Sequence, residues 1–327
     1  MTEAHDPLTE VLRVARVEGA LFSRAEGRCP WGVRTRGAGA GIFHVVLRGQ
    51  GHARALERGR TVLSRGFSEG DLLLFPHGHA HALSDAEGGD ATWIAELPTR
   101  PGDDGLPVVT AGGGAGDLEL LCGTLRFDAE ASRVLLPYLP AMMHAPGGAL
   151  GGWVDATVRQ LAHEAQRGAP GSGLVVARLA EVLFVQAVRA WVASPEGGGP
   201  GWVRALGDPC LARALALLHG APEQPWSVDH LARRAGLSRT VFYDRFTAAV
   251  GEAPAAYLAR WRMTLARRAL RDPGASIPEV AARVGYGSEA AFNRAFKRVV
   301  GAPPGQWRRA SAGDVTAARD PATLPMP

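Results

Sequence analysis

The last third of the chain carries one helical pattern twice. Positions from Ser227 onward recur at an offset of 49 residues as far as an extra glycine, Gly287, and at an offset of 50 thereafter. The recurring positions hold serines, small residues, glycines and aromatics, namely Ser227 with Ser276, Ala232 with Ala281, Gly236 with Gly285, Ser238 with Ser288, Phe242 with Phe292, Phe246 with Phe296 and Tyr257 with Trp307. Such a repeat indicates one supersecondary unit built twice.

Each recurring residue suits one place in a pair of helices. A serine before an apolar run can cap a helix by accepting hydrogen bonds from its free amides. A glycine after the run suits the positive φ that ends a helix. Two phenylalanines four residues apart share one face of the next helix. The repeat therefore predicts a helix, a tight turn and a second helix, twice over.

The two copies differ where side chains point away from the phenylalanines. In the first copy these positions hold Arg239, Thr240, Tyr243 and Asp244. In the second copy they hold Glu289, Ala290, Asn293 and Arg294. A shared scaffold with unlike outer faces is expected when two recognition helices read different base sequences.

Charge and spacing support a DNA partner. Residues 208–309 hold 16 Lys and Arg against 8 Asp and Glu, a balance of +8, whereas the whole chain is at +4. A basic module joined to an acidic one indicates a polyanion partner for the basic module. The segment 255–271 between the copies predicts a helix of roughly 25 Å. With the packing at each end, that length suits two units one DNA turn apart, about 34 Å.

The segment GYGSEAAFNRAFKRVVGAPPGQWRR (285–309) closely resembles the signature of the AraC/XylS family of transcription regulators. The resemblance implies one compact DNA-binding domain of seven helices over 208–309. It also implies that the two unlike outer faces are recognition surfaces that enter successive major grooves.

The resemblance assigns roles by position. Arg294 is expected to bond a guanine edge and Asn293 an adenine. Asp244 is expected to accept from cytosine or to orient Arg245. Three basic side chains are expected at phosphates, which set affinity without reading sequence: Arg245, Lys297 and Arg298. The alternative for Lys297 is a solvated surface charge.

Residues 1–127 read as short strands split by glycines, with a loop predicted over 98–117. The segment 70–81, GDLLLFPHGHAH, fits the second cupin motif, and 43–51, FHVVLRGQG, resembles the first. The resemblance extends to LLCGTLRFD (120–128) and implies the cupin-type sensor half of a subgroup of AraC-type regulators. A cupin-like β-barrel is therefore expected over 1–130.

Four histidines are candidate ligands for a divalent metal in this barrel: His44, His77, His79 and His81. Alternate residues on a strand share one face, which would group the last three. The alternative is a set of structural or surface histidines in a degenerate cupin. No other cofactor is indicated.

Two cysteines are redox candidates, Cys29 and Cys122, because they sit in contexts that resemble regulators sensing oxidants through this half. The chemistry requires an accessible thiolate, which Arg28 and Arg126 would favour. The alternative is that both thiols are small apolar fillers.

The remaining segments connect and end the chain. Residues 131–193 predict a helical connector, with helices over 153–167 and 174–192. This connector is a candidate dimerisation region. The alternative is that its helices pack in the core of their own domain. The run 194–207 predicts a flexible linker and 310–327 a disordered tail. Four polar residues interrupt the apolar stretch 174–192, which argues against a membrane span: Arg178, Glu181, Gln186 and Arg189.

The sequence thus predicts an α+β multidomain chain: a barrel, a connector and an all-α double helix-turn-helix domain. The predicted function is a cytoplasmic, sequence-specific transcription regulator rather than an enzyme, gated by a small molecule or an oxidant in the barrel. Double-stranded DNA and a second copy of the chain are the expected partners, and RNA polymerase is a candidate. The alternatives are a cupin metalloenzyme, such as a dioxygenase or isomerase, with a helical appendage, an architectural DNA binder, or a helical bundle with solvated arginines.

Overall fold

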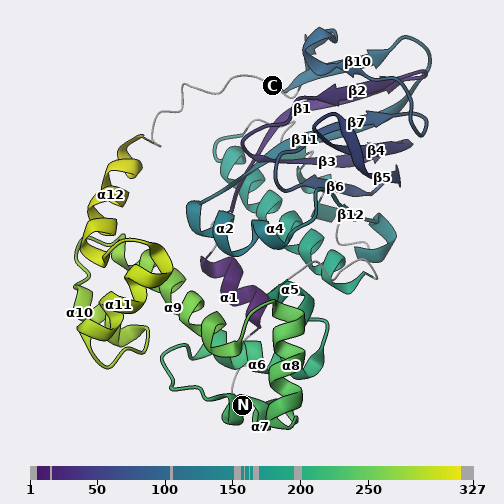
Figure 1. Cartoon of the computed structure of the whole chain (residues 1–327). Helices are drawn as coiled ribbons and strands as arrows, with labels where there is room; N and C mark the ends of the chain where they lie inside the picture. Colours follow the sequence, from purple (N-terminus) through teal and green to yellow (C-terminus); the bar gives the residue numbers. More distant parts are fainter. Residues whose placement is uncertain are drawn as a thin grey trace. The chain divides into compact units, whose positions relative to one another are not determined.

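The computed structural model describes residues 6–14, 17–103, 106–150, 156–157, 159–161, 163–164, 169–194 and 201–317. The chain forms two compact units, which we name the sheet unit (16–132 and 139–197) and the helical unit (1–15, 133–138 and 198–326) (Figure 1). One mostly β part and one all-helical part confirm the predicted α+β class. Among the described residues, no helix has both the length and the apolar character needed to cross a bilayer.

Two sheets build the sheet unit. The seven-stranded sheet runs in the order β12 (Met143–Ala145), β6 (Leu72–Phe75), β3 (Gly41–Arg48), β11 (Gly116–Phe127), β1 (Val17–Arg28), β10 (Pro107–Gly112) and β9 (Thr99–Pro101). The five-stranded sheet runs in the order β5 (Arg60–Ser68), β4 (Gln50–Glu57), β7 (Ala80–Ser84), β2 (Gly32–Thr35) and β8 (Thr92–Trp93). Short helical elements in the described part of this unit include η1 (Ile94–Glu96), η3 (Gly147–Leu150) and α2 (Ala129–Val134). The last two residues of α2 fall in the helical unit.

The loop predicted over 98–117 is instead partly sheet. β10 pairs in parallel with β1, so that Val108 lies opposite Arg24, and β9 pairs with β10. Val108 and Val109 are buried. The glycines and prolines on both sides of β10 favour a loop in the sequence pattern. The strand forms because it pairs with β1, which lies more than eighty residues earlier in the chain.

A long helix covers the seven-stranded sheet. The predicted helix over 174–192 is confirmed as α4 (Ser172–Ala193), which packs on β1, β12 and β6. Its buried face includes Leu183, Phe184 and Val188, and Phe184 meets Phe127 of β11 with ring centroids 5.3 Å apart. These apolar residues therefore belong to the core of their own chain. The helix predicted over 153–167 lies largely outside the described residues.

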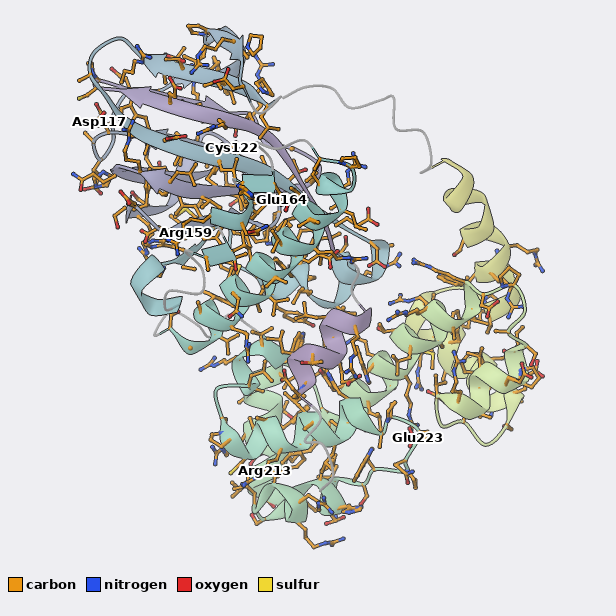
Figure 2. All side chains as sticks on the ribbon, turned by 180° about the vertical axis from the view of Figure 1, so that it is seen from behind. Asp117, Cys122, Arg159, Glu164, Arg213 and Glu223 are labelled. Atoms are coloured by element: carbon orange, nitrogen blue, oxygen red, sulfur yellow. The ribbon has the colours of Figure 1, made fainter. Side chains whose placement is uncertain are left out.

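The helical unit is built from α1 (Pro7–Val14), η2 (Leu136–Tyr138), α5 (Trp202–Ala205), α6 (Pro209–Gly220), α7 (Val228–Ala235), α8 (Arg239–Val250), α9 (Pro254–Leu270), α10 (Ile277–Arg283), α11 (Glu289–Val300) and α12 (Pro304–Ala317). Figure 1 shows α6, α7 and α8 near one end of α9, with α10, α11 and α12 near the other. Arg213 of α6, labelled in Figure 2, donates to the Ala235 carbonyl at the end of α7 over 3.1 Å.

Both copies of the repeat fold as predicted. Each of the four serines caps its helix: Ser227, Ser238, Ser276 and Ser288 all accept a hydrogen bond from the amide three residues on. Gly236 and Gly285 have φ values of 75° and 83°. The four phenylalanines are buried completely.

The cores of the two copies have matching ring contacts. Phe242 and Phe246 lie 5.6 Å apart between centroids, and Phe292 and Phe296 lie 5.5 Å apart. Tyr257 then meets Phe246 edge-on at 5.7 Å, as Trp307 meets Phe296 at 6.1 Å. The duplication in sequence is thus a duplication of packing.

Three predicted boundaries differ from the structure. Residues 7–14, predicted within the barrel domain, form α1 in the helical unit, where Val11 is buried and the His219 ring nitrogen Nδ1 donates to the Pro7 carbonyl over 3.2 Å. Within the predicted linker, α5 is folded because Trp202 is buried and donates to the Val134 carbonyl over 3.1 Å. Helix α12 continues to Ala317, past the predicted end at 309, and 318–327 lie outside the described residues.

Candidate functional site

The outer face of α8 is open to solvent. Its five predicted contact residues are all exposed: Arg239, Thr240, Tyr243, Asp244 and Arg245. The buried Phe242 and Phe246 fix the helix from the opposite side, so these side chains project from a rigid support. A recognition helix requires this arrangement, because base edges are read by side chains held in a fixed register.

The outer face of α11 is exposed in the same way. Glu289, Ala290, Arg294, Lys297 and Arg298 are exposed, and the described part of the chain offers no ion-pair partner to Arg294, Lys297 or Arg298. Three cations on one helix without local neutralisation are available for phosphates and base edges.

Asn293 departs from this pattern. It is half-buried, and its side-chain amide donates to the Glu289 carboxylate over 3.5 Å. Its side-chain oxygen Oδ1 is buried without a hydrogen-bond partner among the described residues. A bidentate contact to adenine uses both amide atoms, so Asn293 requires a different rotamer before it can read that base.

Two arginines of α8 are already engaged. Arg245 forms an ion pair with Asp208, the residue that caps α6, and Arg239 lies 3.6 Å from Asp229. The Arg239 pair is exposed at both ends and is therefore weak, whereas Asp208 is part-buried beneath the exposed Arg245.

One exposed side chain on α8 is not among the predicted contact residues. Val241 is 45% exposed on this otherwise polar face. An apolar side chain here suits contact with the methyl group of thymine.

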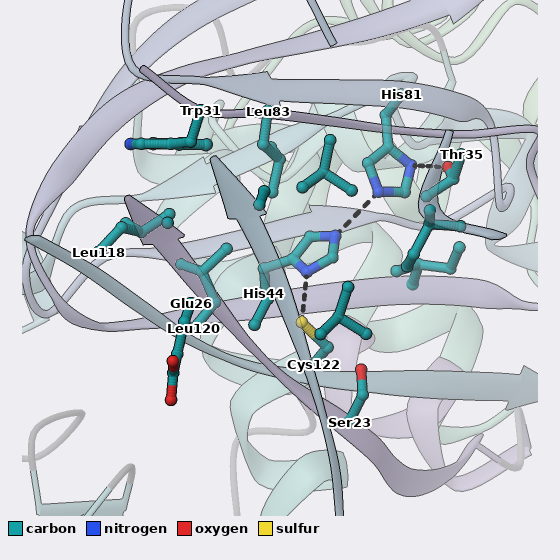
Figure 3. Close-up of a pocket in the computed structure, with 17 residues that line it drawn as sticks. Ser23, Glu26, Trp31, Thr35, His44, His81, Leu83, Leu118, Leu120 and Cys122 are labelled. Atoms are coloured by element: carbon teal, nitrogen blue, oxygen red, sulfur yellow. Dashed lines mark hydrogen bonds between the residues drawn. The ribbon is translucent and has the colours of Figure 1, made fainter. Parts of the chain in front are cut away.

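The sheet unit contains a cavity between its two sheets (Figure 3). Its walls come from β1, β3, β10 and β11 on one side and from β2 and β7 on the other. Four of the nine buried polar side chains found in the described residues line it: Ser23, Thr35, His44 and His81. Buried polar groups are costly unless hydrogen-bonded, so their concentration here marks the cavity as a candidate binding site.

A chain of hydrogen bonds joins these side chains across the two sheets. Cys122 Sγ lies 3.1 Å from His44 Nδ1, and His44 Nε2 lies 2.9 Å from His81 Nε2. His81 Nδ1 lies 2.9 Å from the His79 carbonyl oxygen and 3.1 Å from Thr35 Oγ1. Figure 3 shows the two imidazole rings bridging the space between the strands.

Only one placement of protons satisfies this chain. A carbonyl oxygen accepts only, so His81 carries its proton on Nδ1 and its Nε2 accepts. His44 therefore donates from Nε2 and accepts at Nδ1, which receives the Cys122 S–H. Burial lowers the pKa of His81 to about 4 and that of His44 well below its ordinary value, so both rings are neutral.

The four candidate metal ligands do not come together. His44 and His81 meet, but His77 donates to the Leu139 carbonyl over 2.9 Å and His79 lies beside it. The reason is local: β7 begins at Ala80, so His77 and His79 belong to the turn before the strand rather than to its inner face. Within the described ranges, no three His, Cys, Asp or Glu side chains are arranged to hold a metal ion.

The two redox candidates lie far apart. Cys122 pairs with Ser23 in the middle of β1, whereas Cys29 follows the end of β1 and bonds Ala115. Six residues along a strand cover roughly 20 Å, and a disulfide requires Cα atoms within about 7 Å. The folded sheet unit therefore excludes a bond between the two thiols of one chain.

Neither thiol is poised as a thiolate. Cys122 is buried amid the strands (Figure 2), and burial raises its pKa to about 12. Cys29 is exposed, but its thiol donates to the Asp85 carboxylate over 3.2 Å, and this hydrogen bond raises its pKa. The activation expected from Arg28 is absent, because that side chain pairs with Glu26.

We expect iodoacetamide to alkylate Cys29 in the folded protein and to leave Cys122 unmodified until the chain is unfolded, because only the thiolate of an accessible cysteine reacts. The Asp85→Asn variant should react faster at Cys29, since the carboxylate that holds the thiol proton is gone. Peptide mass spectrometry over a time course measures both rates. Equal labelling of Cys29 and Cys122 in the native protein would contradict the described burial.

Comparisons with known proteins agree with this architecture. Residues 6–193 match the Cupin family model, and residues 231–310 match the Helix-turn-helix domain model. A putative AraC-like transcription regulator of Streptomyces lividans is 33% identical over 93% of this chain and 98% of its own length. The HTH-type transcriptional regulator AlkR of Acinetobacter baylyi is 32% identical over 89% of this chain and 94% of its own.

Among solved structures, the DNA-binding domain of the global transcriptional factor AdpA in complex with a target DNA is 36% identical. The match covers 36% of this chain and 99% of that one, with a TM-score of 0.30.

Proposed function

This chain belongs to the AraC-type family of transcription regulators with a cupin-type N-terminal domain, and on that premise we propose that it reads one operator through α8 and α11 and that a signal in the barrel controls this binding. The protein is a DNA-binding transcription regulator, and its relatives are named as regulators rather than enzymes. The reading of two successive grooves and the control by a signal are the proposal.

The observation that carries the proposal is the pairing of identical cores with unlike outer faces. Phe242 and Phe246 pack as Phe292 and Phe296 do, so both recognition helices are supported in the same manner. α9 between them has 17 residues, a length of roughly 25 Å. That length favours two helices in neighbouring major grooves, which lie about 34 Å apart.

The cavity between the two sheets of the sheet unit, which we call the barrel cavity, supports control by a small molecule better than control by an oxidant. It concentrates four buried polar side chains in one place between the two sheets, beside free space that a ligand can enter. Oxidation, in contrast, requires a thiolate, and neither candidate favours one: burial raises the pKa of Cys122, and the hydrogen bond to Asp85 raises that of Cys29. The proposal also includes a homodimer, which would double the DNA contacts; Leu174 and Val175, exposed on α4, are candidates for its interface.

The Arg294→Ala variant is expected to lose about 1–3 kcal/mol of operator binding and to relax base preference at one position, because arginine bonds a guanine edge through two donors. Gel-shift titration against operator variants, each changed at one base pair, measures both quantities. Arg283→Ala is the matched control, since Arg283 is exposed on α10 rather than on a recognition helix.

Lys297→Ala should instead weaken binding to every DNA sequence alike. The slope of log binding constant against log salt concentration should fall by the equivalent of about one released ion. A uniform loss for Arg294→Ala would remove that residue from base reading. Equal affinity of the unaltered protein for operator and random DNA would overturn the proposed sequence specificity.

A further inference from the structure

We propose that the barrel cavity binds a small, uncharged and mostly apolar molecule that carries one hydrogen-bond acceptor, and that the Thr35 hydroxyl donates to this acceptor. The inference rests on the proposed control of DNA binding by the barrel and specifies the ligand that exerts it.

The wall of the cavity is apolar. Its larger side chains are Trp31, Ile42, Leu83, Val109, Leu118 and Leu120. The histidine rings in the wall turn their nitrogens toward one another and toward Cys122 rather than into the free space (Figure 3). A ligand therefore gains most by burying hydrocarbon surface.

Charged ligands find no counter-charge in the cavity. Glu26 is the one carboxylate in the lining, and outside the cavity it pairs with Arg100 at 2.6 Å and Arg28 at 3.5 Å. His44 and His81 stay neutral because burial lowers their pKa values. An ion transferred to this site would lose its hydration without gaining an ion pair, which disfavours its binding.

The hydrogen-bond chain ends in a donor that a ligand can use. His81 donates from Nδ1 to Thr35 Oγ1 as well as to the His79 carbonyl. The Thr35 hydroxyl thus accepts from the ring, and its own hydrogen finds no acceptor among the residues that the structure describes. A neutral oxygen on the ligand, such as a ketone or ether, would receive it.

The cavity is so small that a bound ligand must push its walls apart. Its free space is about 40 Å³, whereas an apolar cavity that accepts benzene measures about 150 Å³. A single ring can enter only if the walls separate. Because His44 lies on β3 of one sheet and His81 on β7 of the other, that separation stretches the bond between them.

The test uses the full-length protein and four probes of similar size: acetophenone, ethylbenzene, benzoate and benzylammonium. Isothermal titration calorimetry should show binding of the two neutral probes, with acetophenone about 3- to 10-fold tighter because of one added hydrogen bond. Benzoate and benzylammonium should bind at least about 100-fold more weakly than acetophenone.

Three variants separate the parts of the inference. Thr35→Val should remove the preference for acetophenone over ethylbenzene while both still bind. Ser84→Ala is its matched control, since Ser84 is a buried hydroxyl of the same sheet that bonds Ala86 and does not line the cavity. Ala111→Phe fills the cavity and should abolish binding of both neutral probes.

Tight binding of benzoate or benzylammonium would overturn the ligand class, as would no binding of either neutral probe. An unchanged acetophenone preference in Thr35→Val would overturn the role of that hydroxyl. Operator affinity is measured in the same samples by gel shift. Neutral probes that bind without altering operator affinity would refute control by the barrel and leave the ligand class supported.

Discussion

The Phe296→Ala variant is expected to lower the free energy of unfolding of the helical unit by about 3–5 kcal/mol, because it leaves a cavity where a whole ring was buried. Phe296 has no exposed surface and contacts the rings of Phe292 and Trp307. It belongs to a cluster of buried side chains from α9, α10 and α11. Urea denaturation of the full chain measures the loss as a shift of the midpoint at constant slope.

The duplication makes this expectation sharper. Phe246→Ala should cost about the same, within about 1 kcal/mol, because its ring is equally buried and meets Phe242 and Tyr257 at matching distances. Val299→Ala is the control on the same helix as Phe296, since this side chain is 38% exposed and should change stability by less than about 0.5 kcal/mol. A cost below about 1 kcal/mol for Phe296→Ala would show that the ring is not a core residue.

The helical repeat could be predicted residue by residue because its rules are local. A cap, a positive-φ glycine and two aromatics four residues apart each depend on neighbours within one or two helical turns. Ser276, Gly285 and Phe292 therefore took the predicted roles. What the repeat could not predict was Asn293, which is half-buried and donates to Glu289 on the same face.

The sheet unit was less predictable because its contacts are distant in sequence. His44 and His81 were candidates by residue type, but their bond joins positions 37 residues apart on different sheets. Thr35 carries no motif, and only its pairing with His81 across β2 and β7 reveals it. Likewise nothing in 7–14 indicated that α1 packs on α6, because that contact depends on His219, 212 residues beyond Pro7.

His219 also makes the helical unit sensitive to acid. The Pro7 carbonyl accepts from its Nδ1, so its Nε2 accepts the Tyr257 hydroxyl proton over 2.6 Å, and the ring stacks on Trp261 at 4.3 Å. Burial is the main reason that its pKa falls to about 3; Arg260 lowers the pKa further, while the Pro7 hydrogen bond and Asp6 oppose the shift. The folded unit therefore holds this ring neutral where the unfolded chain would protonate it.

The sign of the effect follows from proton counting. Between the ordinary pKa of 6.5 and the folded pKa of about 3, the unfolded chain binds one more proton than the folded unit, so stability rises with pH. The folded unit therefore keeps its full stability above the pKa that His219 has in the unfolded chain, and loses stability as the pH falls below that value. Acidification to about pH 4.5 should lower the free energy of unfolding through His219 by about 2–3 kcal/mol.

Denaturant titrations across this pH range measure how steeply the free energy of unfolding changes with pH. The His219→Gln variant isolates the part of this slope that His219 contributes. Glutamine does not titrate, so the pH slope of the unfolding free energy of the helical unit should fall by the equivalent of nearly one bound proton. This holds even if the variant is less stable at neutral pH. The sheet unit is the internal control, because its own acid sensitivity through His81, whose pKa is about 4, is untouched. An unchanged slope in His219→Gln would mean that the ring is already solvated in the native state, contrary to its burial beside Trp261 and Tyr257.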